Sequence, residues 1–208
     1  MAALSTPPED ASFPTPDGGI VYADLYGAGD RGVVLAHGSR FDKASWKDQA
    51  TRLASAGFRV AALDFRGYGK SRAGAKSESP QDDMYLDVLA AASYLRQRGA
   101  KSVAVIGGSM GGRASANAVV KGAPGSIDRL VLLAHAPIEH PERITGPKLF
   151  AVAQDDPIAP QVREQYKKAP EPKELLVLDG LAHAQFLFTT DQGERLMQAI
   201  IRFLSEAQ

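Results

Sequence analysis

The chain has 208 residues, of which 44% are hydrophobic, and its 24 basic side chains balance its 24 acidic ones. This composition allows one sizeable core, and the balanced charge gives no reason to expect nucleic acid or an anionic membrane surface as a partner. The chain has no cysteine, which excludes disulfides, thiolate metal sites and a cysteine nucleophile.

The first ten residues lack the basic and apolar regions of a signal peptide, and no apolar run approaches the roughly 20 residues that span a bilayer. We therefore expect a cytoplasmic protein without a membrane span. Residues 1–18 are expected to form a flexible tail. Residues 19–208 are expected to form a single domain, because no change in composition marks a linker within them.

Apolar runs and alternating patterns predict strands, the first of them an edge strand, at residues 19–25, 33–36, 58–63, 102–106, 130–133, 149–152 and 175–178. Apolar side chains at helical spacing predict helices at residues 45–56, 81–98, 110–120 and 193–205. This alternation indicates an α/β fold, with a mostly parallel central sheet covered by helices on both faces. The short connection from Ala134 to Lys148 leaves no room for a cap domain, so a site at this end of the sheet should be open.

The pattern Gly-x-Ser-x-Gly occupies residues 107–111, between a predicted strand and a predicted helix. A serine on such a sharp turn is exposed at the carboxyl end of a parallel sheet, where sites form. A phosphate-binding loop or an ordinary tight turn is the alternative, but the Lys-Ser/Thr pair of a phosphate loop is missing. The pattern therefore predicts that Ser109 is a nucleophile.

A serine hydroxyl needs a base, and the chain has four histidines. His183 follows the last predicted strand and is the preferred base. His135, which ends a strand and could line the pocket, is the second choice, whereas His37 is expected to serve the geometry of its turn and His140 to be solvated. Asp155 and Asp156 follow the preceding strand, and one of them should orient the imidazole.

We choose Asp156, because Pro157 restrains the residue before it to extended geometry. The oxyanion of acyl transfer needs about two backbone donors. The N–H groups of Met110, directly after the nucleophile, and of Ser39, after Gly38, are expected to supply them. Arg40 and Arg113 could favour an acidic substrate, but such arginines are more often surface or structural residues.

Four motifs in this order resemble those of the α/β-hydrolase superfamily, from about Gly19 to the C-terminus: residues 37–40, residues 64–71, the serine turn, and the Asp-then-His ending. The chain looks like small lidless serine esterases, including relatives of dienelactone hydrolase, but Ser109 stands where that group has a cysteine. The resemblance also favours Asp156 over Asp155. It implies hydrolysis of an ester or a related acyl bond. An esterase that works through these residues needs no metal and no organic cofactor.

The first functional hypothesis is a carboxylesterase that acts on small, short-chain acyl esters through an acyl-enzyme intermediate. A thioesterase or an amidase would use the same residues, and a cofactor-free perhydrolase is a weaker alternative. The other class is a non-catalytic member of the fold that binds a ligand or a partner protein, since fold alone does not fix function. The natural substrate and the oligomeric state stay open.

Overall fold

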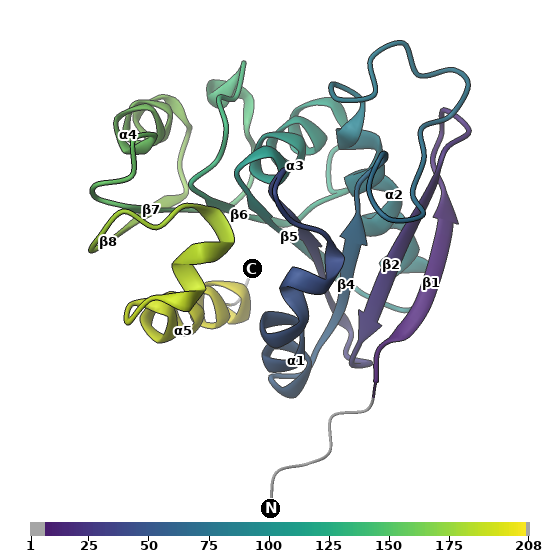
Figure 1. Cartoon of the computed structure of the whole chain (residues 1–208), viewed down its shortest axis with the longest axis horizontal. Helices are drawn as coiled ribbons and strands as arrows, with labels where there is room; N and C mark the ends of the chain where they lie inside the picture. The colour runs from purple at the N-terminus through teal and green to yellow at the C-terminus, as the bar shows by residue number, and fades with distance from the viewer. Residues whose placement is uncertain (1–6, 207–208) are drawn as a thin grey trace, which may run out of the picture.

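A computed structural model of the chain describes residues 7–206, and its strands join in one sheet (Figure 1). The strands are β1 Glu9–Pro14, β2 Ile20–Tyr26, β3 Arg31–Ala36, β4 Phe58–Asp64, β5 Ser102–Gly108, β6 Arg129–Leu133, β7 Lys148–Ala153 and β8 Lys173–Leu178. Their spatial order is β1-β2-β4-β3-β5-β6-β7-β8. The pairs β1–β2 and β2–β4 are antiparallel, and all other pairs are parallel. The expected mostly parallel sheet is confirmed.

Helices cover both faces of this sheet (Figure 1). They are α1 Lys47–Ser55, α2 Met84–Gln97, α3 Met110–Lys121, α4 Ala159–Lys168 and α5 Gly193–Ser205, with the short 3₁₀ helices η1 Lys43–Trp46, η2 Pro141–Arg143 and η3 Ala184–Thr189. Alternate residues of β3 show how the core is divided. Val33 and Leu35 pack on the α1 and α5 side, whereas Val34 and Ala36 pack on the α2, α3 and α4 side. The sheet therefore lies between two apolar layers.

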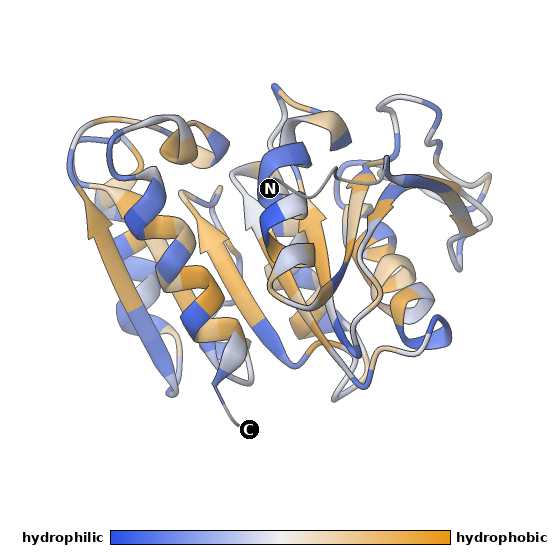
Figure 2. Ribbon diagram, turned by 90° about the horizontal axis from the view of Figure 1, so that it is seen from below, coloured by the Kyte–Doolittle hydropathy of each residue, from blue (hydrophilic) through white to orange (hydrophobic). Residues whose placement is uncertain are grey.

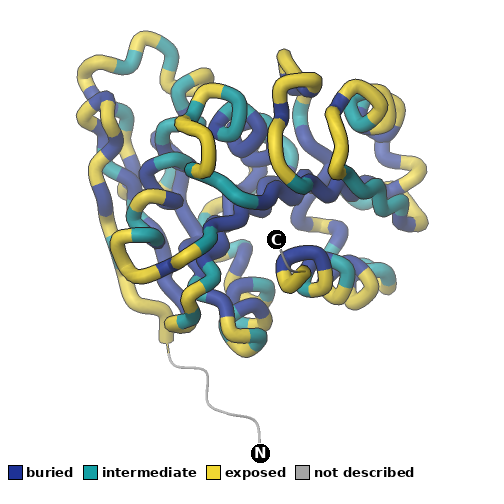
Figure 3. The backbone as a smooth tube through the Cα atoms, turned by 180° about the vertical axis from the view of Figure 1, so that it is seen from behind, coloured by how far each residue is buried: buried dark blue, intermediate teal, exposed yellow. Residues whose placement is uncertain are grey.

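The central strands are continuous apolar runs because helices bury both of their faces. Figure 2 shows these strands as mostly hydrophobic, while the helices also carry hydrophilic residues. In Figure 3 the middle of the sheet is buried and the exposed segments lie mainly in connections and on outer helix surfaces. No helix within residues 7–206 is both long and apolar enough to cross a membrane.

The N-terminal segment differs from the expected flexible tail over residues 1–18. Residues 1–6 lie outside the described part of the chain, but Glu9–Pro14 is a strand that pairs with β2. Phe13 is buried, and its ring stacks on Tyr94 of α2 with the centroids 4.8 Å apart. The tail prediction is therefore wrong for this strand, and β1 rather than β2 is the edge strand. Only one large apolar side chain marks the strand in the sequence, and a distant helix supports it.

Helix α4 is absent from the sequence-based expectations. Its apolar face is small, since its buried residues are Ala159 and Val162 and most of its other side chains are polar. Packing on β7, rather than a strong amphipathic pattern, holds it on the sheet. The connection from β6 to β7 contains only η2, and no cap domain is present among the described residues. The carboxyl ends of the central strands are therefore open to solvent on that side.

Candidate active site

Ser109 lies on the sharp turn between β5 and α3. Its backbone has φ 49° and ψ −114°, a positive-φ conformation that a non-glycine residue adopts only when its surroundings hold it there. The Ser109 N–H donates to the carbonyl of Leu133 at 2.9 Å, and the Ala136 N–H donates to the carbonyl of Ser109 at 2.9 Å. The end of β6 and the loop after it therefore hold the serine in its strained position, with its side chain half-exposed.

The glycines around Ser109 are required by close backbone approaches. A Cβ on Gly111 would lie 2.3 Å from the carbonyl oxygen of Ala36, and a Cβ on Gly107 would lie 2.5 Å from the carbonyl oxygen of Gly111. Both distances are too short for any side chain. The glycine pattern seen in the sequence thus reflects how tightly β3, β5 and the start of α3 pack together.

His183 and Asp156 meet Ser109 from two other strand ends. His183 Nε2 lies 2.9 Å from Ser109 Oγ, and His183 Nδ1 lies 2.7 Å from Asp156 Oδ2. An ionised carboxylate only accepts hydrogen bonds, so Nδ1 carries the proton and, in the neutral ring, Nε2 is free to accept the serine proton. The structure therefore joins the three predicted residues in one hydrogen-bonded chain.

The carboxylate of Asp156 is well supported. The residue is 4% exposed, and its second oxygen, Oδ1, accepts a hydrogen bond from the N–H of Ile158 at 3.1 Å. Asp155 is exposed, and its own N–H donates to the carbonyl of Gly180 at 2.9 Å. Of the two aspartates that the sequence offers, Asp156 is the one that contacts the imidazole.

Both backbone groups proposed for the oxyanion border Ser109. Met110 is the next residue, and a Cβ on Gly38, next to Ser39, would lie 3.4 Å from Ser109 Cβ. The N–H of Gly38 already donates to Gln185 Oε1 at 3.1 Å. Within residues 7–206, the N–H groups of Ser39 and Met110 make no hydrogen bond to another part of the chain. Both N–H groups are therefore free, in backbone segments that adjoin Ser109.

Tyr68 and Gln185 contact this loop, and the sequence patterns did not single them out. The Tyr68 hydroxyl donates to the carbonyl oxygen of Ser39 at 3.0 Å and lies 3.8 Å from Met110 Sδ. Gln185 holds Gly38 as described above. Tyr68 could have been suspected because it lies in the motif at residues 64–71, whereas no local sequence pattern marks Gln185.

The other histidines do not reach Ser109. His37 is buried and uses both ring nitrogens, since Nδ1 donates to the Gly38 carbonyl at 2.9 Å and Nε2 accepts from the Phe65 N–H at 3.2 Å. Burial lowers its pKa, so the ring stays neutral. The structure therefore gives His37 the role in its turn that the sequence suggested.

His135 is buried rather than exposed on a pocket wall. Burial lowers its pKa to about 4 despite the hydrogen bond to the Ala136 carbonyl, so the ring is neutral at physiological pH. It packs behind the serine turn, because a Cβ on Gly112 would lie 2.7 Å from His135 Cβ. The idea that His135 lines the pocket is thus wrong. His140 is exposed beside Glu142, as expected for a solvated residue.

Arg66, in the motif at residues 64–71, is a structural residue. Its buried guanidinium pairs with Asp17 at 2.8 Å and with Asp87 at 2.7 Å. It therefore ties the turn between β1 and β2 to α2 and to the loop that carries Tyr68. Of the two arginines weighed as substrate ligands, Arg40 is exposed and Arg113 is half-exposed.

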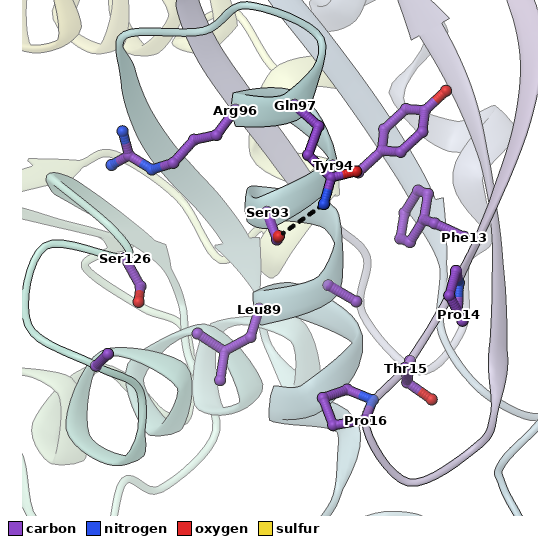
Figure 4. Close-up of a pocket in the computed structure, with 12 residues that line it drawn as sticks. Phe13, Pro14, Thr15, Pro16, Leu89, Ser93, Tyr94, Arg96, Gln97 and Ser126 are labelled. Atoms are coloured by element: carbon purple, nitrogen blue, oxygen red, sulfur yellow. Dashed lines mark hydrogen bonds between the residues drawn. The ribbon is translucent and has the colours of Figure 1, made fainter.

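A hollow of about 590 Å³ lies over α2, between β1 and the segment that follows α3 (Figure 4). Phe13, Leu89 and Tyr94 are among its lining residues, and Ser93 and Gln97 hydrogen-bond to each other at its wall. None of Ser109, Asp156 and His183 lines it. The hollow is therefore separate from the candidate active site, which lies at the carboxyl edge of the strands.

Solved structures similar to this chain share its fold. An esterase of Pyrococcus furiosus superposes with a TM-score of 0.77 at 21% identity, covering 95% of this chain and 91% of the esterase. An α/β hydrolase from a Penicillium species superposes with a TM-score of 0.80 at 16% identity, covering 96% of this chain and 98% of that protein. At these identities the likeness concerns the fold alone.

Among curated proteins, a putative protein-lysine deacylase of Rattus norvegicus is 27% identical over 186 residues, which cover 84% of this chain and 83% of the deacylase. An Escherichia coli 2-hydroxy-6-oxononadienedioate/2-hydroxy-6-oxononatrienedioate hydrolase is 34% identical over 110 residues, which cover 51% of this chain and 37% of that hydrolase. The family model of serine aminopeptidase, S33, matches residues 28–138, just over half of the chain. Fold, strand order and family match agree, and the chain belongs to the serine aminopeptidase S33 family of the α/β-hydrolase superfamily.

Proposed function

We propose that the protein is a serine hydrolase that cleaves short-chain carboxylic esters through an acyl-enzyme intermediate. The single observation that carries this proposal is the hydrogen-bonded chain from Asp156 through His183 to Ser109. The strained backbone at Ser109 adds support, because residues with such strain cluster at active sites.

In the first half-reaction, Ser109 Oγ attacks the carbonyl carbon of the ester while His183 Nε2 takes the hydroxyl proton. The negative charge that forms on the carbonyl oxygen is stabilised by the N–H groups of Met110 and Ser39. The bond to the leaving alcohol then breaks, and the alcohol oxygen takes the proton from Nε2. The product of this step is an ester between the substrate's acyl group and Ser109.

In the second half-reaction, a water molecule attacks the acyl carbon while His183 Nε2 takes a proton from it. The bond to Ser109 Oγ breaks, the serine recovers the proton from Nε2, and the carboxylic acid leaves. Asp156 stays ionised and stabilises the imidazolium that forms in both halves. The amino end of α3 points at this centre and favours the developing negative charge. The cycle consumes only the ester and water.

The proposed preference for short acyl groups follows from the open site. The described residues form no cap, and the exposed large apolar side chains near His183 are Leu181 and Phe186, 73% and 44% exposed. Leu181 and the ring pair of Phe186 with Phe41 offer an exposed surface but no wall around a long chain. The transition state should therefore gain little from added CH₂ groups, each worth only about 0.8 kcal/mol when fully buried.

The test is reaction of the purified protein with a fluorophosphonate, followed by hydrolysis of p-nitrophenyl acetate and butyrate. We expect one covalent adduct on Ser109, found by peptide mass spectrometry, and steady ester turnover. A binding protein of the same fold would not activate the serine, so a lack of both labelling and turnover would contradict the proposal. Hydrogen peroxide-dependent halogenation, assayed in parallel, separates a perhydrolase from an esterase.

A second candidate is removal of acyl groups from lysine side chains of proteins, an amide hydrolysis that uses the same three residues. The open site favours it, since a substrate presented on another protein's surface needs unobstructed access to Ser109. The similarity to the putative protein-lysine deacylase points in the same direction. Release of acetate from an acetyl-lysine peptide, compared with release from the phenyl ester, distinguishes the two substrate classes.

A further inference from the structure

Gln185 is a buried polar residue that connects the histidine loop to the loop carrying Ser39. It lies two positions after His183 and is 5% exposed. Its Oε1 accepts a hydrogen bond from the Gly38 N–H at 3.1 Å, and its Nε2 donates to Ser45 Oγ at 3.0 Å. One side chain therefore joins the segment after β3 to the segment after β8. Gly38 and Gln185 are 147 positions apart in the sequence.

The surrounding backbone leaves space for this amide. A Cβ on Gly108 would lie 2.8 Å from Gln185 Oε1, and a Cβ on Gly38 would lie 3.3 Å from the same atom. Gly108 directly precedes Ser109. The amide oxygen thus lies against the backbone on both sides of the proposed reaction centre, in a place that larger residues at these two positions would obstruct.

The direction of the hydrogen bonds fixes how the amide is turned. Ser45 Oγ donates to the carbonyl of Asp42 at 2.6 Å, so its oxygen is left to accept from Gln185 Nε2. Nε2 must therefore face Ser45, and Oε1 must face the Gly38 N–H. With Gly38 occupied in this way, the next N–H along the loop, that of Ser39, stays free beside Ser109.

A ring contact joins the same two segments a second time. Phe186, which follows Gln185, packs on Phe41, with ring centroids 4.9 Å apart and planes tilted by 60°. The Phe41 N–H donates to the Gly38 carbonyl at 3.0 Å, which closes the loop into a tight turn. The loop is thus held at Gly38 by the amide and at Phe41 by the ring.

We propose that Gln185 is a positioning residue that fixes the Ser39 N–H for the oxyanion, and this inference rests on the proposed function. Gln185 does not touch the reacting atoms and acts through Gly38. The Gly38 carbonyl keeps its hydrogen bonds from the Phe41 N–H and from His37 Nδ1, but without the amide of Gln185 the N–H side of Gly38 has no anchor. The Gly38 backbone can then shift, and the direction of the adjacent Ser39 N–H shifts with it. The loss should appear in the transition state, where the oxyanion is fully charged, and hardly in substrate binding.

The experiment compares Gln185→Met, which keeps the side-chain length but makes no such hydrogen bonds, with Gln165→Met as a matched control. Gln165 also bridges backbone groups, accepting from the Ile138 N–H at 3.1 Å and donating to the Ile138 carbonyl at 2.8 Å, but it lies on α4. For Gln185→Met we expect kcat on p-nitrophenyl acetate to fall at least about tenfold, with KM within about twofold. Gln165→Met should retain kcat within about twofold, whatever it does to the melting temperature.

A trifluoromethyl ketone, which forms an oxyanion on the serine, supplies the readout that a merely structural role would not move. Its inhibition constant should rise in Gln185→Met by about the factor by which kcat falls, and should stay unchanged in Gln165→Met. Ser45→Ala keeps the glutamine but removes the partner that orients its amide, and should give a smaller loss of the same kind. This variant keeps the test valid if Gln185→Met folds poorly.

Folded variants of Gln185 and Ser45 with unchanged kcat and unchanged inhibitor affinity would overturn the positioning role while leaving the esterase intact. A pure rise in KM would also overturn it, because that would place Gln185 in substrate binding. A wild-type protein that neither hydrolyses the esters nor reacts with a fluorophosphonate would instead remove the proposed function, and the positioning role with it. The two failures are therefore distinct.

Discussion

Asp156 Oδ2 lies 2.7 Å from His183 Nδ1, while the adjacent Asp155 is exposed to solvent. The difference arises at the end of β7, where the chain turns and consecutive side chains point in different directions. Asp156 enters the interior and accepts the N–H of Ile158 as well as the imidazole. Two chemically identical neighbours are thus placed in unlike surroundings, which makes them a matched pair for mutation.

Asp156→Asn should lower kcat at least about a hundredfold, whereas Asp155→Asn should stay within about tenfold of the wild type. An amide at position 156 would hold the imidazole in the wrong tautomer, with its proton on the nitrogen that has to accept from Ser109. Steady-state hydrolysis of p-nitrophenyl butyrate measures both variants. A large loss of kcat in Asp155→Asn with a small loss in Asp156→Asn would contradict the assignment. Small losses of kcat in both variants would mean that neither aspartate orients the histidine.

Ser109→Ala should abolish ester hydrolysis and fluorophosphonate labelling, because loss of the nucleophile typically costs several orders of magnitude in rate. The hydroxyl contributes to no other described contact than the one with His183, so the fold should be retained. Circular dichroism and thermal unfolding check the fold. Turnover above about a tenth of the wild-type value in a folded variant would mean that another group is the nucleophile.

Acetyl and butyryl esters should be better substrates than esters with acyl chains of about twelve carbons, since a long chain finds no enclosing apolar wall. A series of p-nitrophenyl esters of increasing length, each kept below its aggregation concentration, measures kcat/KM. Values that rise from butyrate to laurate would indicate a groove for the acyl chain and contradict this expectation.

Asp17→Asn should destabilise the protein by about 2 kcal/mol near neutral pH. Burial alone would raise the pKa of Asp17, but the hydrogen bonds from Thr15 and Arg66 and the charge of Arg66 outweigh it and lower this pKa to about 2. A carboxyl group whose pKa is lowered by folding stabilises the protein at pH values above its unfolded pKa of 3.8. This stabilisation is lost as the pH falls towards 2.

Urea unfolding of the wild type and Asp17→Asn, at pH values from about 7 down to about 2.5, measures this contribution. The difference in unfolding free energy between the two proteins should shrink below about pH 4. Burial raises the pKa of the neighbouring Asp87, and the charge of Asp17 raises it further, so the difference between the two proteins includes the response of Asp87 to the loss of that charge. A difference that does not change with pH would mean that packing, and not charge, accounts for the effect.

The sequence predicted the parts of this fold that depend on strong local patterns. Helix α5 has the expected bounds, and the continuous apolar runs became the central strands. The site residues could be named because a strained serine turn needs glycines in a fixed pattern, and because the carboxyl ends of parallel strands share one edge. The structure brings Ser109, Asp156 and His183 together at that edge.

The elements that were missed depend on contacts with distant parts of the chain. Strand β1 is held by its pairing with β2 and by Phe13 against Tyr94, neither of which leaves a periodic signal. No local sequence pattern marks Gln185, because its role depends on a hydrogen bond with Gly38, which is far away in the sequence. Side chains that position other groups are therefore harder to read from a sequence than those that carry out the chemistry.

The absence of a cap among residues 7–206 also has a kinetic consequence. In hydrolases with a mobile cover, opening of that cover can limit turnover and can depend on contact with a lipid surface. In this protein the described chain has nothing to move away from His183, whose side chain is 40% exposed. Hydrolysis should therefore follow simple saturation with dissolved substrate and show no abrupt rise when the ester begins to form micelles.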